Sequence, residues 1–197
     1  MARAGLNAEI LVEAALRMLD AEPDRPLALA PLAAEFGVAV PSLYKHIRGL
    51  DALRGLVAIR MVDTLADALT ANVATESACA EPAAGLAAIA HAYRAVARTH
   101  PGGYAFLLRA PGAGEDALHA AAARVLAPIL RVLATYGLTG DAAIDAARVV
   151  RSGLHGFTSL ERAGGFGLPR EVDRSFAVLI DALDAACARG ALAASGR

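Results

Sequence analysis

The stretch "GVAVPSLYKHIRGL", residues 37–50, decides the fold that we expect, and it holds the one lysine of the chain, Lys45. Gly37 can adopt the left-handed conformation that ends a preceding helix. Pro41 suits the first turn of a helix, which we predict over residues 40–47. The side chains that this helix leaves on its outside or at its edges are Ser42, Tyr44, Lys45 and His46.

Two further helical patterns precede this stretch. Apolar residues recur at helical spacing from Asn7 onward, and the Asn7 side chain can cap the first turn. The segment "AEPDRP" breaks that helix, and a short helix is predicted over residues 31–36. In the next helix, Leu43 and Ile47 lie four residues apart and share an inner face. Two short helices joined by a glycine turn are typical of a helix-turn-helix, whose second helix fits the major groove of DNA.

The rest of the chain keeps the spacing of helices. Loops rich in glycine and other turn formers separate the patterns. No segment alternates with period two over the length of a strand, so we predict an all-α fold. The first of these helices, from Asp51, is long enough to link two parts of the chain. The predicted helices cover residues 51–71, 82–100, 117–136, 141–164 and 171–189.

Composition limits the classes of protein to consider. The chain has 197 residues, 56% of them hydrophobic, and a formal net charge of −1, so it can bury a sizeable core. Its longest run without a charged residue, residues 82–93, is far shorter than the roughly 20 apolar residues that span a bilayer. Glu9 and Glu13 interrupt the apolar segment that a signal peptide needs. We therefore expect no membrane helix and a cytoplasmic location.

No catalytic or metal-binding pattern stands out. Cys79 and Cys187 lie far apart in the sequence, and no Cys or His spacing matches a zinc site. Ser152 precedes His155 by three positions, but no third residue orients the pair. We therefore expect no metal, no cofactor and no catalytic residue. The histidines from which an enzyme would draw its acid–base group are His91, His100, His119 and His155.

Two parts of the chain carry a family resemblance, and the first of them consists of two stretches. "ILVEAALRMLD" (residues 10–20) and "LALAPLAAEFGVAVPSLYKHIRGLDALRGLVA" (residues 27–58) resemble the N-terminal domain of the tetracycline-repressor (TetR) family. The later "RSGLHGFTSLERAGGFGLPREVDRSF" (residues 151–176) is similar to the C-terminal domain of one branch of that family, named WHG for a Trp-His-Gly triplet. Leu154 stands where that triplet has its tryptophan, and His155 follows it.

The resemblance implies a division of the chain and a function. Residues 1–50 form a helix-turn-helix DNA-binding domain, and residues 51–197 form a helical regulatory and dimerisation domain. We expect a homodimeric transcriptional regulator, a repressor that a small, mostly apolar molecule releases from double-stranded operator DNA. A helical ligand-binding protein that kept the fold and lost DNA binding is the alternative.

Carried over residue by residue, the resemblance also implies the DNA contacts. Tyr44 and His46 contact the sugar-phosphate backbone, which positions the protein without reading sequence. Ala28, Ala30 and Ala39 replace polar residues that the family commonly has, and a lost helix cap costs around 1 kcal/mol. These departures predict weaker operator binding and favour the alternative. The residues expected to read bases are Val40, Pro41, Ser42 and Lys45.

The second domain is expected to hold the ligand and the dimer contact. Pocket walls and plain core packing are both open readings of its aromatic residues. Gly153 and Gly156 allow close approach between the last two helices and their counterparts in a second subunit. The stripe expected to face that subunit consists of Val172, Phe176, Leu179, Ile180 and Leu183. The residues expected to line a pocket are Tyr93, Tyr104, Phe106 and His155.

Overall fold

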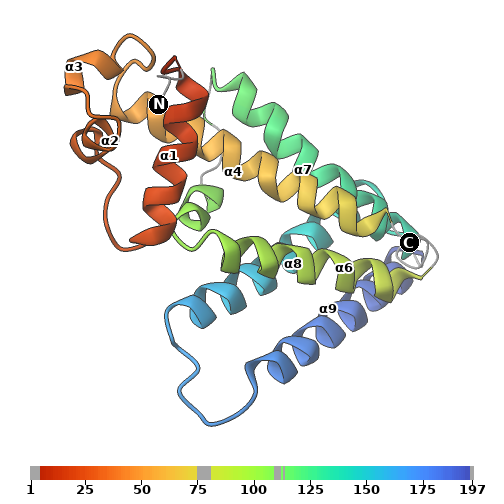
Figure 1. The fold of residues 1–197 in the computed structure, drawn as a ribbon. Helices are drawn as coiled ribbons and strands as arrows, with labels where there is room; N and C mark the ends of the chain where they lie inside the picture. The colour runs from red at the N-terminus through yellow and green to blue at the C-terminus, as the bar shows by residue number, and fades with distance from the viewer. Residues whose placement is uncertain (1–4, 75–80, 109–111, 113, 196–197) are drawn as a thin grey trace. The chain divides into compact units, whose positions relative to one another are not determined.

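The computed structural model describes residues 5–74, 81–108, 112 and 114–195, and every regular element within them is helical (Figure 1). This confirms the predicted all-α fold. The elements are α1 (Ala8–Ala21), α2 (Leu29–Glu35), α3 (Val40–Leu43), α4 (Leu50–Val73), α6 (Pro82–Thr99), the 3-10 helix η1 (Gly103–Leu108), α7 (Asp116–Thr135), α8 (Gly140–Arg162) and α9 (Val172–Ser195).

The chain forms two compact units. The first comprises residues 1–64 and 99–121, and the second comprises residues 65–98 and 122–197. The first unit therefore takes in the beginning of α4 and all of η1, in addition to α1, α2 and α3. The functional division at residue 50 stays a prediction, because compactness does not say which residues bind DNA.

The core of the first unit follows the predicted pattern. The side-chain Oδ1 of Asn7 accepts a hydrogen bond from the backbone N–H of Ile10 at 2.9 Å, and so caps α1. Leu32 of α2 and Leu43 of α3 are fully buried, and the three helices pack in sequence. Gly37 has φ +63°, the left-handed conformation required of the turn between α2 and α3.

Helix α3 is shorter than the helix predicted over residues 40–47. Helix α3 ends at Leu43, and residues 44–46 form turns instead of continuing to Ile47. Ile47 is still buried, and its N–H still donates to the carbonyl of Leu43 at 3.0 Å. Ala39 offers no side-chain cap hydrogen bond, so this helix begins with little support, although Pro41 suits its first turn. The burial of Leu43 and Ile47 was predicted correctly, but the length of the helix was not.

In the second unit, α8 and α9 pack closely. A Cβ added at Gly153 would lie 3.3 Å from a methyl carbon of Leu183, so this glycine allows α8 to approach α9 within one chain. Phe176, Ile180 and Leu183 of α9 are buried in the single chain. The stripe predicted to face a second subunit therefore packs inside the chain at these three positions, and that part of the prediction is wrong.

A buried arginine joins three helices of this unit. Arg94 of α6 is only 7% exposed, and its guanidinium donates to Glu161 of α8 at 2.8 and 2.5 Å. It also pairs with Asp173 in the first turn of α9 at 2.7 Å. Its carbon Cζ lies 4.5 Å from the ring centre of Phe176 and 5.7 Å from that of Phe157. Two carboxylates and two aromatic faces thus compensate the buried charge.

This ion pair makes stability depend on pH. Hydrogen bonds from Arg94 lower the pKa of Glu161 below its ordinary value, and burial offsets only part of that effect. A carboxyl whose pKa is lower in the folded state stabilises the fold above its unfolded pKa, and this contribution is lost as pH falls through the folded pKa.

We therefore expect the free energy of unfolding in urea to fall as pH drops below about 4.3, the ordinary pKa of glutamate. The Glu161→Gln variant removes this titration and should lose less stability over the same interval. Equal losses in the two proteins would contradict the role given to this carboxylate.

Candidate nucleic-acid interface

The residues predicted to contact DNA lie on one short segment of the first unit. Pro41, Tyr44 and Lys45 are exposed, and Tyr44 exposes 56% of its surface, an unusual value for a large aromatic residue. Beneath them, the buried Leu43 and Ile47 anchor the segment to the core. The half-buried members of the predicted set are Val40, Ser42 and His46.

Four arginines of the first unit pair with carboxylates. Arg17 of α1 pairs with Glu35 of α2 at 2.8 Å. Of the other three pairs, one joins α4 to α1 and two join residues that are three positions apart. These internal pairs neutralise the cations that take part in them. The remaining pairs are Arg25 with Glu22, Arg54 with Asp51 and Arg60 with Glu13.

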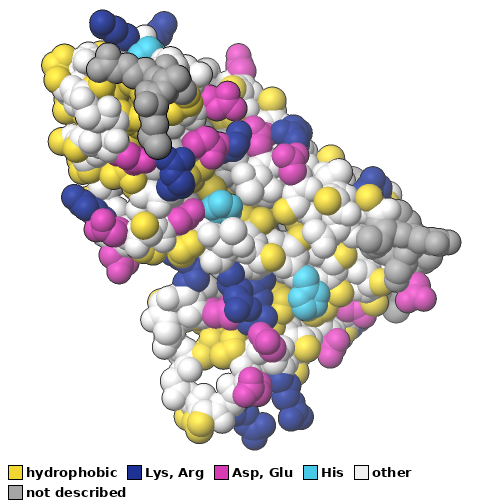
Figure 2. Space-filling model, in the orientation of Figure 1, with side chains coloured by type: hydrophobic (Ala, Val, Ile, Leu, Met, Phe, Trp, Pro, Cys, Tyr) yellow, Lys and Arg dark blue, Asp and Glu magenta, His cyan; other side chains and the backbone are white. Residues whose placement is uncertain are grey.

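Lys45 and Arg48 differ from these arginines. Among the described residues of the first unit, they are the two cations that form no ion pair. Figure 2 shows Lys and Arg side chains beside a histidine at the top of the view, at the end of this unit where α3 lies in Figure 1. In the part of this unit that the structure describes, the uncompensated positive charge is therefore local to residues 45–48, although the region is not basic overall.

Arg48 was not among the predicted site residues. Its sequence neighbour Asp51, three positions along, offers an apparent partner, but in the structure the Asp51 carboxylate accepts from Arg54 at 3.1 Å. The sequence shows that Arg48 and Arg54 could both pair with Asp51, but it does not show which of them does. With φ +121°, Gly49 provides the turn between Arg48 and the start of α4 at Leu50.

The three alanines noted in the sequence lie at informative positions. Ala28 and Ala39 are the N-cap residues of α2 and α3, and neither helix has a side-chain cap hydrogen bond. Ala30 is exposed on α2. Both short helices of the motif therefore begin without the support that a serine or threonine supplies.

The four residues predicted to line a ligand pocket are divided between the units. Tyr104 and Phe106 belong to η1 in the first unit, and Tyr93 and His155 belong to α6 and α8 in the second. Both tyrosines are buried. The Nε2 atom of His155 lies 3.2 Å from the hydroxyl of Ser159, and burial, with the charge of Arg151, lowers the pKa of His155. Their role as a pocket stays a prediction.

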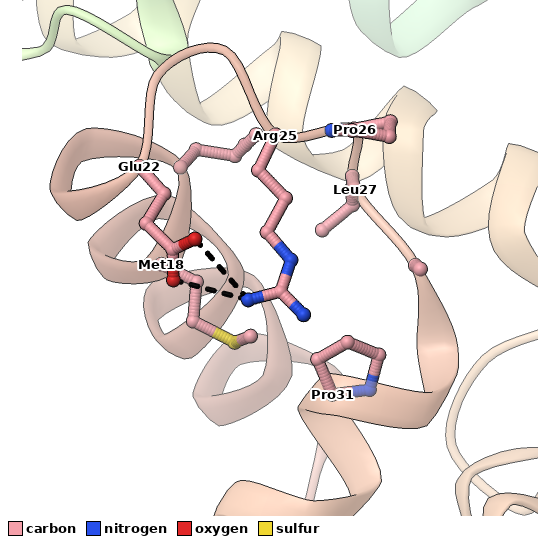
Figure 3. A pocket seen from close by; sticks show the side chains of 8 residues that line it. Met18, Glu22, Arg25, Pro26, Leu27 and Pro31 are labelled. Atoms are coloured by element: carbon pink, nitrogen blue, oxygen red, sulfur yellow. Dashed lines mark hydrogen bonds and ion pairs between the residues drawn. The ribbon is translucent and has the colours of Figure 1, made fainter.

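A small pocket lies elsewhere in the first unit. Figure 3 shows it between the end of α1 and the start of α2, with Arg25 reaching toward the Glu22 carboxylate at 3.0 Å. None of the four residues predicted to hold a ligand lines it. Its lining residues are Met18, Leu19, Glu22, Arg25, Pro26, Leu27, Ala28 and Pro31.

Metal sites and membrane-spanning helices were both searched for among the described residues. No group of three or more His, Cys, Asp or Glu side chains there is arranged to hold a metal ion. By length and composition, helix α7 could cross a membrane, although its sequence pattern predicted a helix of a soluble domain. Its Arg124 pairs with Asp67 of α4 at 2.5 Å. Core helices of soluble proteins meet the same two criteria.

Comparison with known proteins gives a consistent result. Residues 86–183 match a family described as "Tetracyclin repressor-like, C-terminal domain". The HTH-type transcriptional regulator Rv0681 of Mycobacterium tuberculosis is 39% identical over 82% of this chain and 72% of its own length. The HTH-type transcriptional regulator YobS of Bacillus subtilis is 32% identical over 80% of each chain.

A solved structure extends the likeness to the fold. A TetR variant from Acinetobacter baumannii in complex with minocycline has a TM-score of 0.69 and 22% identity, covering 93% of this chain and 97% of its own. At that identity the match shows a shared fold alone.

Proposed function

Because the chain belongs to the TetR family of transcriptional regulators, we propose that it is a repressor that binds operator DNA through residues 40–48. The observation that carries this proposal is the pair of uncompensated cations, Lys45 and Arg48, beside the exposed Tyr44. Unpaired cations attract phosphates, and Lys or Arg can also donate to the edge of guanine. The family is one of transcriptional regulators, not of enzymes.

We assign the remaining contacts by position on the segment. Val40, Pro41 and Ser42 begin α3 and are proposed to face base edges together with Lys45, because the start of a recognition helix enters the major groove. Tyr44 and His46 are proposed to contact the sugar-phosphate backbone, while Arg48 is proposed to bind a phosphate. In a bacterium this function places the protein in the cytoplasm, with the DNA.

A mobility-shift titration with DNA upstream of its own gene tests this proposal. The wild-type protein should retard that duplex, and Lys45→Ala and Tyr44→Ala should each bind it more weakly. Lys45→Ala should reduce the salt dependence if Lys45 contacts a phosphate, and relax sequence preference if it contacts guanine. Unchanged affinity in both variants would refute the assignment of the segment.

One observation favours the second candidate function, a helical ligand-binding protein that no longer binds DNA. The N-cap positions of α2 and α3 hold Ala28 and Ala39, so neither helix has a side-chain cap. Restoring serine at Ala39 should strengthen DNA binding if the missing cap only weakens it. If neither the wild type nor Ala39→Ser retards any duplex, the second candidate is favoured.

We propose that the protein is a homodimer, because two recognition helices must lie about 34–36 Å apart to reach successive major grooves on one face of DNA. The exposed apolar residues of α8 and α9 support this pairing. Val149, Gly156 and Leu160 follow one exposed face of α8, and Val178 is 61% exposed on α9. We assign the twofold contact to these residues instead of the buried stripe.

Substituting Val178→Asp is expected to dissociate the dimer. A charge in the centre of an apolar twofold contact is desolvated in both subunits, and we expect the dissociation constant to rise at least about 100-fold. Sedimentation equilibrium at micromolar concentration measures this. Leu168→Asp is the matched control, because Leu168 is 81% exposed in the connection between α8 and α9 and lies off the proposed face. A wild-type monomer, or equal effects of both variants, would contradict the assignment.

We propose that a small, mostly apolar effector releases the protein from DNA. The support is family membership. The residues that we propose for effector binding stay those predicted from the sequence, Tyr93, Tyr104, Phe106 and His155. The helix α4, which continues from the first unit into the second, is the physical link for such coupling. Linkage requires that operator DNA weaken the effector by the same factor by which the effector weakens DNA.

A further inference from the structure

The two carboxylates that pair with Arg94 differ in how firmly they are held. The Glu161 carboxylate accepts hydrogen bonds from both Nε and Nη2 of Arg94, at 2.8 and 2.5 Å, and 19% of its side chain is exposed. The Asp173 carboxylate lies 2.7 Å from Nη2 through one oxygen, and 77% of its side chain is exposed. Asp173 can therefore leave Arg94 by rotating into solvent, whereas Glu161 is held inside the second unit.

The charges around Arg94 balance only while Asp173 is in place. Hydrogen bonds from Arg94 are the main cause that lowers the pKa of Glu161, and the positive charge of Arg98, one turn along α6, lowers it further. Two arginines therefore offset two carboxylates here. When Asp173 turns away, the two arginines and Glu161 keep a net charge of +1, and a buried guanidinium that loses a partner is unfavourable. An anion that took the place of Asp173 would restore the balance.

Aromatic rings lie beside the same guanidinium. The Phe176 ring is centred 4.5 Å from Cζ of Arg94, and the Phe157 ring is centred 5.7 Å from it. The Phe157 ring in turn contacts the Phe166 ring, with the two centres 4.8 Å apart. Phe166 lies in the connection between α8 and α9 and is 36% exposed. A continuous aromatic surface therefore leads from the buried Arg94 to solvent.

We infer that Arg94 anchors a ligand site that binds a carboxylate attached to an aromatic or apolar group, in exchange for the side chain of Asp173. The carboxylate of the ligand pairs with the guanidinium, and its apolar part packs against Phe157 and Phe166. Because the exchange replaces one ion pair by another, the gain in affinity comes from the apolar contact. This inference goes beyond the proposed function, since none of the four residues predicted to line a pocket takes part in it.

An NMR titration of the full-length protein with benzoate as the probe tests this inference. The Asp173→Ala variant should bind benzoate about tenfold more tightly than the wild type does, because no side chain then competes for Arg94. The matched control is Glu171→Ala, which removes the same charge from an exposed residue just before α9 and should bind as the wild type does. Benzamide has the same ring without the charge, and it should bind far more weakly than benzoate.

The outcomes decide the inference without reference to DNA. Tighter binding of benzoate by Asp173→Ala, and not by Glu171→Ala, supports the site. Equal affinities of Asp173→Ala and the wild type, equal gains in the two variants, or benzamide binding as tight as that of benzoate would rule the site out, and so would a failure of Asp173→Ala to bind benzoate. Should alanine disturb the start of α9, Asp173→Asn carries the same test, because it removes the charge and keeps the size of the side chain.

Discussion

Replacing both Lys45 and Arg48 by alanine is expected to weaken operator binding at least about 100-fold. These two residues carry the positive charge of the first unit that ion pairs leave uncompensated among the residues described. Each change occurs twice in a homodimer, so the magnitude of the slope of log K against log salt should fall by roughly 3 to 4 if all four cations meet phosphates. Fluorescence-anisotropy titrations at several salt concentrations measure both quantities.

Arg54→Ala is the matched control for this experiment. It removes one cation of the same unit, but that cation already pairs with Asp51 at 3.1 Å. We expect a small change in affinity and little change in the salt slope. If Arg54→Ala weakens binding as much as the double variant does, the local distribution of charge does not determine where DNA binds.

Replacing Arg94 by alanine is expected to lower the free energy of unfolding by about 3 kcal/mol or more, since removing one partner of a buried ion pair leaves the other uncompensated. The side chain of Glu161 is mostly buried and receives two hydrogen bonds from Arg94, so it would lose both. The aromatic faces of Phe157 and Phe176 would also lose the cation that lies over them. Urea unfolding at neutral pH measures the change.

The comparison for this prediction is Arg148→Ala. Arg148 pairs with Asp145 on the surface of α8, where both side chains are exposed. Exposed pairs contribute between about 0 and 1 kcal/mol, so this variant should be close to the wild type. Equal losses from both substitutions would show that burial of the Arg94 network adds nothing to stability.

Local signals made much of the fold predictable. Asn7 predicts the start of α1, and Gly37 predicts the turn before α3, because each acts through contacts within a few residues. The length of α3 was overestimated, because periodicity predicts which face is buried but not whether a short helix without a cap continues. The family resemblance then predicted that the segment holding Lys45 contacts DNA.

Features that depend on long-range contacts were not predictable in this way. The apolar stripe of α9 was assigned to a second subunit, yet Phe176 and Leu183 pack within the chain. An amphipathic pattern shows that a face is covered, but not whether the cover is the same chain or another copy. Arg94 contacts Glu161, which lies 67 residues away in the sequence, and the Asp20 carboxylate contacts His100, which lies 80 residues away. No spacing pattern in the sequence could therefore reveal these contacts.

The most direct test of the central claim is selection of DNA by the wild-type protein from a random duplex library, followed by titration of the selected sequence. We predict an inverted repeat whose half-sites lie about 10 base pairs, or a multiple of that, apart, bound at least about 1,000-fold more tightly than a scrambled duplex. The Lys45→Ala, Arg48→Ala double variant should lose most of this affinity. Failure to enrich any sequence, or equal affinity for the selected and scrambled duplexes, would contradict the assignment of residues 40–48 as a sequence-specific DNA-binding segment.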